Sequence, residues 1–216
     1  IPTIHNPTTA TMPLQRRMDI VKVAQRHHLH IIEDDPYSLL MDSPLPALAA
    51  LDHGRVSYIV TLAKTLSPGL RTAYIALPST DMARRVAAAI RAIALTNAGL
   101  LSALTARWMQ TEKAHTILRA IQKELRLRQN IARNILGDGH CMNPDGPHVW
   151  LKLPDWWGSA DFVAYARRRG LALVPSTVFT ISGEPPQRAR IALGSAPDLV
   201  LIHISEPKRQ AEISDA

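Results

Sequence analysis

Residues 61–71 read TLAKTLSPGLR, and this stretch decides the fold that we expect for the chain. Lys64 stands in a short polar turn directly after the apolar, strand-like run 58–62, and a Pro-Gly corner and Arg71 follow it. A lysine amine becomes nucleophilic where burial lowers its pKa, and an arginine binds a phosphate through two parallel hydrogen bonds. The spacing therefore suits a phosphorylated aldehyde cofactor, with a solvated lysine and a surface arginine beside an ordinary turn as the alternative.

Three further motifs place polar side chains on or at the ends of strand-like runs. Asn6, in NPTT, carries a carboxamide that can donate a hydrogen bond to a phenolate-like oxygen. Asp34 and Tyr37, in EDDPY, flank Pro36, which stiffens the turn so that both side chains can converge on one planar ligand. Arg190, in RARIALGS, lies in mid-strand between apolar neighbours, where an isolated cation needs an anionic partner.

The composition describes a chain that can bury a substantial core. It has 216 residues, 46% of them hydrophobic, and its one cysteine, Cys141, excludes an internal disulfide and the paired cysteines of structural zinc sites. No apolar stretch approaches the roughly 20 residues that span a bilayer, and no signal peptide precedes the first strand. These features predict a cytoplasmic protein without a membrane partner.

The formal net charge of +7 leaves a nucleic-acid or other anionic partner open. Much of the excess lies in helix-like stretches at 84–85, 126–133 and 167–169, which favours solvated helix faces over a dedicated partner surface. The His, Glu and Asp residues between 27 and 35 do not predict a metal site, because neighbours on a strand point to opposite faces.

Hydrophobic periodicity predicts alternating strands and helices, which is typical of an α/β fold. Helices are expected at 14–27, from an N-cap at Ser79 to about 95, at 100–110, at 114–136 and at 159–169. Short apolar runs predict strands at 3–5, 29–32, 56–62, 72–77, 149–153, 171–174 and 189–193.

Taken in order, NPTT, EDDPY, TLAKTLSPGLRTAY and ARIALGS resemble the fold-type-I, pyridoxal-phosphate-dependent aminotransferases of class I and II, from Ile1 to about Ala196. The resemblance implies a three-layer transferase fold with pyridoxal 5'-phosphate as cofactor and a homodimer as the assembly. It implies that residues 1–111 form the C-terminal part of a large domain with a mostly parallel sheet. A connecting helix at 112–137, a small α+β domain at 138–198 and an unassigned tail at 199–216 would follow.

The resemblance also implies a role for each motif residue around the cofactor ring. Lys64 would form the Schiff base with the aldehyde and later move the substrate proton. Asp34 would pair with the protonated pyridine nitrogen, and a carboxylate placed there raises the pKa of that nitrogen. Tyr37 and Asn6 would hydrogen-bond the phenolic oxygen.

The remaining implied roles concern the two anionic groups. Thr61 and Arg71 would hold the phosphate, and Arg190 would bind the substrate α-carboxylate through two hydrogen bonds. The sequence departs from the family pattern at Thr9, where glycine is usual, and at Ala63, where serine is frequent. The glycine-rich phosphate loop and the stacking aromatic ring that the family supplies upstream have no counterpart, so we expect half of a cofactor site.

Two functions fit this resemblance. PGLRTAYI, ILRAIQKELRLRQNIA, GPHVWLKLP and GLALVPSTVF are most similar to MocR-type regulators of the GntR family, in which a winged-helix DNA-binding domain precedes an aminotransferase-like domain. We therefore expect the part of such a regulator that senses an amino acid, an amine or the cofactor, with DNA bound only through an N-terminal domain absent from these residues. The alternative is a free-standing aminotransferase that moves an amino group between an amino acid and a 2-oxo acid.

Overall fold

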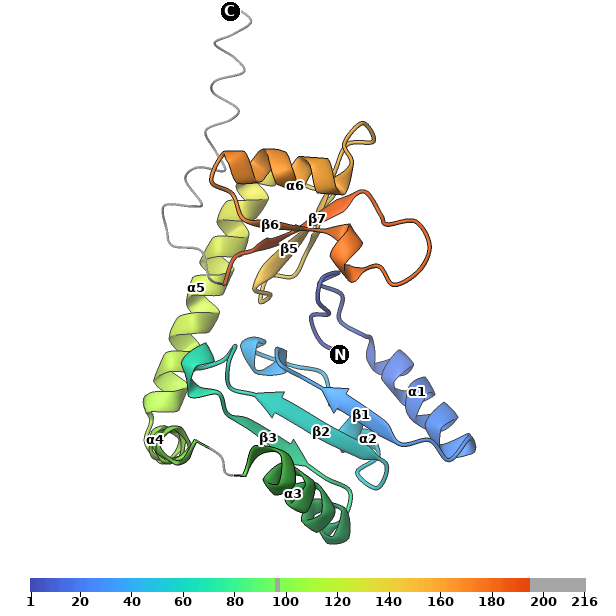
Figure 1. The fold of residues 1–216 in the computed structure, drawn as a ribbon, viewed down its shortest axis with the longest axis vertical. Coiled ribbons are helices and arrows are strands. Elements are labelled where there is room, and N and C mark those ends of the chain that lie inside the picture. The colour runs from blue at the N-terminus through green and yellow to red at the C-terminus, as the bar shows by residue number, and fades with distance from the viewer. Residues whose placement is uncertain (96–97, 195–216) are drawn as a thin grey trace, which may run out of the picture. The chain divides into compact units, whose positions relative to one another are not determined.

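The computed structural model describes residues 1–95 and 98–194 of the chain (Figure 1). Its contacts divide the chain into two compact units. The first comprises Ile1–His5 and Thr11–Gln122, and the second comprises Asn6–Ala10 and the residues from Lys123 onward. The long helix α5 (Lys113–Leu136) begins in the first unit and ends in the second. The four segments predicted from the sequence remain a prediction, and the tail at 199–216 lies outside the described residues.

The first unit contains a three-stranded sheet in the order β1-β2-β3 (Figure 1). Strand β1 (Ile31–Asp34) is parallel to β2 (Val56–Thr61), and β3 (Ala73–Ala76) is antiparallel to β2. The chain turns back between β2 and β3 through a loop without a crossover helix, which gives an antiparallel pair. Hence one pairing of this sheet is parallel and one is antiparallel in the described part of the chain.

Helices surround this sheet in the first unit. They are α1 (Leu14–Arg26), the short α2 (Leu48–Leu51), α3 (Thr80–Ala94) and α4 (Gly99–Gln110). The Ser79 hydroxyl accepts a hydrogen bond of 3.1 Å from the Met82 amide, so the predicted N-cap of α3 is confirmed. Val21 of α1, Leu48 of α2 and Val56 of β2 form a buried cluster that packs these two helices on the sheet.

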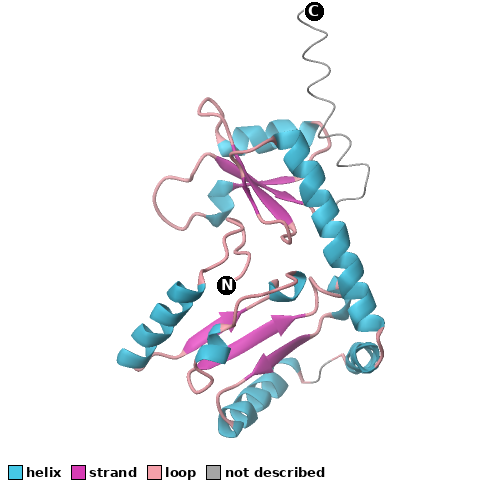
Figure 2. Cartoon of the chain, turned by 180° about the vertical axis from the view of Figure 1, so that it is seen from behind, coloured by secondary structure: helices cyan, strands magenta, loops and turns pink. Residues whose placement is uncertain are grey.

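The second unit contains a four-stranded antiparallel sheet in the order β4-β5-β7-β6. Its strands are β4 (Cys141–Met142), β5 (His148–Lys152), β6 (Leu173–Pro175) and β7 (Arg188–Ala192). Figure 2 shows its strands in magenta and its helices in cyan. Ala132 of α5 and Val163 of α6 (Ser159–Arg168) share one buried cluster with Val149 and Ile191, so both helices pack on one face of this sheet.

Side chains alternate between the two faces of these strands. Val149 and Leu151 of β5, with Ala189 and Ile191 of β7, belong to the core under the helices. Trp150 and its cross-strand neighbour Arg190 therefore project from the opposite face. This alternation determines where a ligand of Arg190 can approach the second unit.

The element bounds agree with the periodicity to within two residues at most positions, with one clear exception. Residues 3–5 were expected to form a strand, and the structure gives them no strand pairing. Thr3 and Ile4 are instead fully buried in a bend. The Ile4 amide donates to the Thr11 hydroxyl and the Thr3 hydroxyl accepts from Arg17, so these bonds replace the pairing of a strand. No helix in the described ranges is both long enough and apolar enough to cross a membrane.

Candidate functional site

Asp34 and Tyr37 lie where β1 ends, and the residue between them that fixes the turn is Asp35. The Asp35 carboxylate is 1% exposed and accepts hydrogen bonds of 3.0 Å from the Ser38 amide and from the Tyr58 hydroxyl. Its own amide donates to the Ile59 carbonyl at 2.8 Å. Asp35 thus anchors the turn while Asp34 stays exposed and Tyr37 is buried.

The Tyr58 phenol is partly buried beside this turn and donates a hydrogen bond to the Asp35 carboxylate. Burial of the phenol is the main factor that raises the pKa of Tyr58 to about 12, and the neighbouring Asp35 carboxylate adds to the shift. A neutral phenol that donates to a buried carboxylate stabilises the turn. Asp35 and Tyr58 therefore stabilise the turn that follows the exposed Asp34.

Lys64 lies in the loop that joins β2 to β3. The Leu62 amide donates to the Thr72 carbonyl at 3.1 Å, which closes the base of the loop. The Leu66 amide donates to the Leu62 carbonyl at 2.9 Å, so Lys64 lies inside a helix-like turn above the buried Leu62 side chain. The predicted polar turn is present, whereas the side chain of Lys64 is exposed and not buried.

Thr61 and Arg71 lie near the two ends of the same loop. Thr61 is the last residue of β2 and pairs with Ala73, two residues after Arg71. The Thr61 hydroxyl accepts from the Ala63 amide at 3.2 Å, and Arg71 has a left-handed backbone with φ of 49°. A non-glycine residue in this region is uncommon, and here it ends the short turn Pro68–Leu70 with an exposed arginine.

The register of the sheet brings these residues to one edge of the first unit. Asp34 pairs with Ile59, two residues before Thr61, and the two strands run parallel. Their carboxyl ends therefore share one edge of the sheet, where ligands of α/β proteins bind. The residues gathered at this edge are Asp34, Tyr37, Thr61, Lys64 and Arg71.

The other two predicted site residues, Asn6 and Arg190, lie in the second unit and are hydrogen-bonded to each other. Nη1 of Arg190 donates a hydrogen bond of 2.9 Å to Oδ1 of Asn6. The Nε atom of Arg190 is buried and has no hydrogen-bond partner. A buried donor without a partner is rare and costly, and a carboxylate would satisfy it. The arrangement fits an anionic group such as a carboxylate.

Sequence reasoning missed the aromatic surroundings of Arg190. The guanidinium carbon lies 5.2 Å from the ring centre of Phe179, and that ring meets Trp150 edge to face at 5.8 Å. Trp150 itself is buried, at 5% exposure. Trp157 also packs against the core, whereas Trp156 is 81% exposed. The alternation of side chains along β5 and β7 was the signal that could have placed Trp150 and Arg190 on the same face of the sheet.

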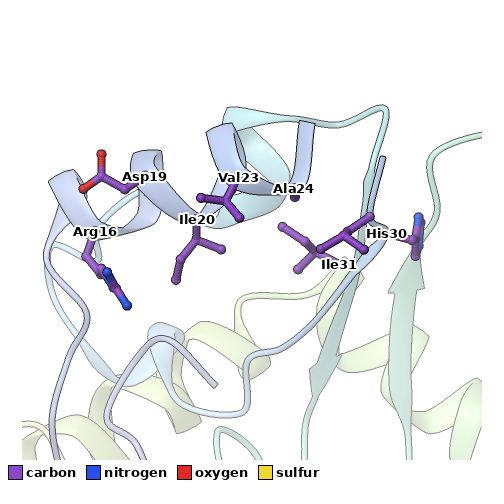
Figure 3. A pocket seen from close by; sticks show the side chains of 8 residues that line it. Arg16, Asp19, Ile20, Val23, Ala24, His30 and Ile31 are labelled. Carbon is purple, nitrogen blue, oxygen red and sulfur yellow. The ribbon is translucent and has the colours of Figure 1, made fainter. Parts of the chain in front are cut away.

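The first unit also contains a pocket. It has a volume of about 290 Å³ between α1 and the start of β1, and Figure 3 shows its lining side chains. They are Arg16, Asp19, Ile20, Val23, Ala24, Leu29, His30 and Ile31. None of the predicted site residues is among them. Across residues 1–95 and 98–194, no group of three or more His, Cys, Asp or Glu side chains could hold a metal ion.

The sequence profile of the family described as aminotransferase class I and II matches residues 1–201. An uncharacterized HTH-type transcriptional regulator of Bacillus subtilis, YdeF, is 31% identical over 190 residues, which cover 88% of this chain and 41% of that protein. The regulator TauR of Rhodobacter capsulatus is 28% identical over 81% of this chain and 38% of its own length. An uncharacterized aminotransferase of Saccharolobus solfataricus is 25% identical over 93% of this chain and 52% of its own length. The chain thus spans about half, or less, of these relatives.

Solved structures share the fold. The kynurenine aminotransferase of Pyrococcus horikoshii, in complex with PMP, matches with a TM-score of 0.86 and 23% identity, over 99% of this chain and 55% of its own. The α-aminoadipate aminotransferase LysN of Thermus thermophilus, complexed with N-(5'-phosphopyridoxyl)-L-leucine, matches with a TM-score of 0.82 and 22% identity. That match covers 97% of this chain and 56% of LysN.

Proposed function

The chain belongs to the class I and II aminotransferase family, and on that premise we propose that it is the ligand-sensing, pyridoxal-phosphate-binding domain of a MocR-type transcription regulator. The observation that carries the cofactor assignment is the common edge at which Asp34 and Lys64 follow two parallel strands. The assignment to a regulator draws on similarity to YdeF and TauR, both HTH-type transcriptional regulators.

The residues at the edge suit the parts of pyridoxal phosphate in charge and in hydrogen bonding. Arg71 and the Thr61 hydroxyl would bind the phosphate, since an arginine offers paired N–H donors and the hydroxyl offers another. Asp34 would face the pyridine nitrogen. When bound, the cofactor supplies an aldehyde that condenses with amines and a ring that accepts electrons.

Within this site the chain's own groups would bind, orient and hold protons. The exposed Lys64 amine would be the nucleophile and the base that accepts a proton from a bound amino acid. The Asp34 carboxylate would hold a proton on the pyridine nitrogen of the cofactor, because an opposite charge raises the pKa of such a nitrogen. Tyr37 and Asn6 would donate hydrogen bonds to the phenolic oxygen.

Arg190 would bind the α-carboxylate of the sensed amino acid. Its unpartnered Nε and its remaining N–H groups can donate to two carboxylate oxygens, while Asn6 already orients Nη1. The guanidinium also lies over the ring of Phe179, and this cation–π contact favours its observed orientation. An amine without a carboxylate would leave the buried Nε unsatisfied, so we propose an amino acid as the preferred ligand.

A free-standing aminotransferase is the second candidate. It draws on the similarity to the Saccharolobus solfataricus aminotransferase, which extends over 93% of this chain. Both candidates use the same groups, and both fit a homodimer in the cytoplasm. They differ in whether binding of an amino acid leads to release of a 2-oxo acid or to a change in DNA affinity.

The test uses the complete protein, pyridoxal phosphate and a panel of L-amino acids. A visible absorbance change on adding the cofactor, absent in Lys64→Ala and present in Lys113→Ala, is expected for either candidate. A shift in affinity for the DNA upstream of the protein's own gene, without 2-oxo acid release, supports the regulator. Repeated turnover to a 2-oxo acid without any effect on DNA supports the enzyme. No absorbance change with the cofactor contradicts both.

A further inference from the structure

The face of the second sheet that lies opposite its helices gathers positive charge. Arg188 stands two residues before Arg190 on β7, so both side chains project from the face that carries Trp150. Lys152 of β5 is the cross-strand partner of Arg188 and shares this face. We call Lys152, Arg188 and Arg190 the cationic cluster. All three residues belong to the second unit, so one sheet determines their arrangement.

The cationic cluster has no acidic partner in the described part of the chain. Across residues 1–95 and 98–194, the ion pairs involve other side chains. Lys152 and Arg188 stand directly opposite each other on two strands, where like charges are destabilising. Arg188 and Arg190 are half-buried, and salt screens partly buried charges less than exposed ones. A bound anion would offset this repulsion.

Contacts from one nitrogen orient Arg188. Its Nη1 atom donates to the Trp150 carbonyl and to Sγ of Cys141, both at 3.3 Å, and a thiol sulfur is a weak acceptor. A guanidinium carries five N–H donors, so the contacts within the described residues leave the edge formed by Nε and Nη2 for a ligand. That edge can bind a carboxylate through two parallel hydrogen bonds. Arg188 is therefore held in an orientation that suits an anion.

We propose that Arg188 and Lys152 form a second anion site, which binds the distal carboxylate of an amino acid whose α-carboxylate binds Arg190. Residues two apart on a strand are separated by about 6.6 Å, and the two carboxylates of L-glutamate span a comparable distance. One such molecule can therefore contact both arginines. The preferred ligand class is then a dicarboxylic amino acid. The inference rests on the proposed role of Arg190.

The test compares the affinities of the complete protein, without added cofactor, for L-glutamate and L-glutamine, which have the same shape and differ in the distal charge. NMR titration should give L-glutamate an affinity at least about tenfold higher. Arg188→Gln should bring this ratio close to one without weakening L-glutamine, and Lys152→Gln should lower it about threefold. Arg167→Gln removes one exposed charge from α6, so it is the matched control and should leave the ratio unchanged.

The outcomes separate this proposal from the one on which it rests. Equal affinities for L-glutamate and L-glutamine in the unaltered protein would overturn the second anion site and leave the role of Arg190 intact. Equal losses in Arg188→Gln and Arg167→Gln would also overturn it, because net charge would then explain the effect. Arg190→Met should weaken both ligands, and unaltered affinities there would overturn both proposals. If Arg188→Gln fails to fold, the exposed Lys152 still decides the result, since Lys152→Gln must lower the ratio.

Discussion

The edge of the first unit and the Arg190 cluster of the second unit prepare for a ligand in different ways. At the edge, Asp34, Lys64 and Arg71 are exposed, and main-chain bonds of the strands and of the loop place them. In the second unit, Arg190 is held by direct contacts from two side chains, Asn6 and Phe179. The comparison teaches that backbone geometry prepares the proposed cofactor site, whereas side-chain packing prepares the proposed carboxylate site.

The largest expected effect separates two adjacent aspartates. Asp34→Asn should slow proton abstraction from a bound amino acid by at least about 100-fold, because the cofactor nitrogen that Asp34 is proposed to face would lose the charge that keeps it protonated. Thermal stability should change little, since Asp34 is exposed. Stopped-flow absorbance of the complete protein with cofactor measures the rate, and an unaltered rate would refute the role of Asp34.

Asp35→Asn is the matched control for that variant, and its effect should be on folding. The Asp35 carboxylate is buried and accepts from both the Ser38 amide and the Tyr58 hydroxyl. Replacing one acceptor oxygen with a donor should cost about 1–3 kcal/mol of unfolding free energy. Urea unfolding checks this, and equal stability of both aspartate variants would remove the distinction between them.

In the second unit, the prediction concerns coupling between Asn6 and Arg190. Single changes Asn6→Ala and Arg190→Met should each weaken carboxylate binding, and the double variant should lose less than their sum. The interaction energy is expected to be about 0.5–3 kcal/mol, as for residues in contact. A double-mutant cycle on acetate affinity measures it. Additive effects would indicate that the 2.9 Å bond does not prepare Arg190.

The smallest expected effect is a pH dependence of the first unit. Burial raises the pKa of Tyr58 from 10.0 to about 12, so this phenol stays protonated in the folded chain after it ionises in the unfolded one. Its contribution is complete below pH 10 and falls between pH 10 and 12. Because the phenol is only partly buried, solvent screening reduces the expected loss to about 1–2 kcal/mol. Tyr58→Phe should flatten that part of the stability curve. An equally steep loss in the variant would assign the alkaline transition to another group.

Sequence alone predicted what depends on local pattern. Apolar periodicity located the helices, and Ser79 identified the start of α3 because its hydroxyl bonds locally to the Met82 amide. The turn residues at the ends of β1 and β2 were found because polar residues directly follow apolar runs.

Sequence could not predict what depends on distant contacts. Asn6 and Arg190 are 184 positions apart, and no local pattern pairs them. Arg17 resembles its exposed neighbour Arg16 in sequence, and only the folded loop reveals that it is fully buried. The exposure of Lys64 likewise depends on what packs around the loop, which the residues of the loop do not specify.

The most direct test of the central claim is to find which lysine reacts with the cofactor. The complete protein is mixed with pyridoxal phosphate, reduced with borohydride, digested and mapped by mass spectrometry. The account predicts a phosphopyridoxyl mass on the peptide that contains Lys64, lost in Lys64→Ala and strongly reduced in Arg71→Ala. Modification confined to another lysine, such as the exposed Lys113 or Lys123, would contradict it.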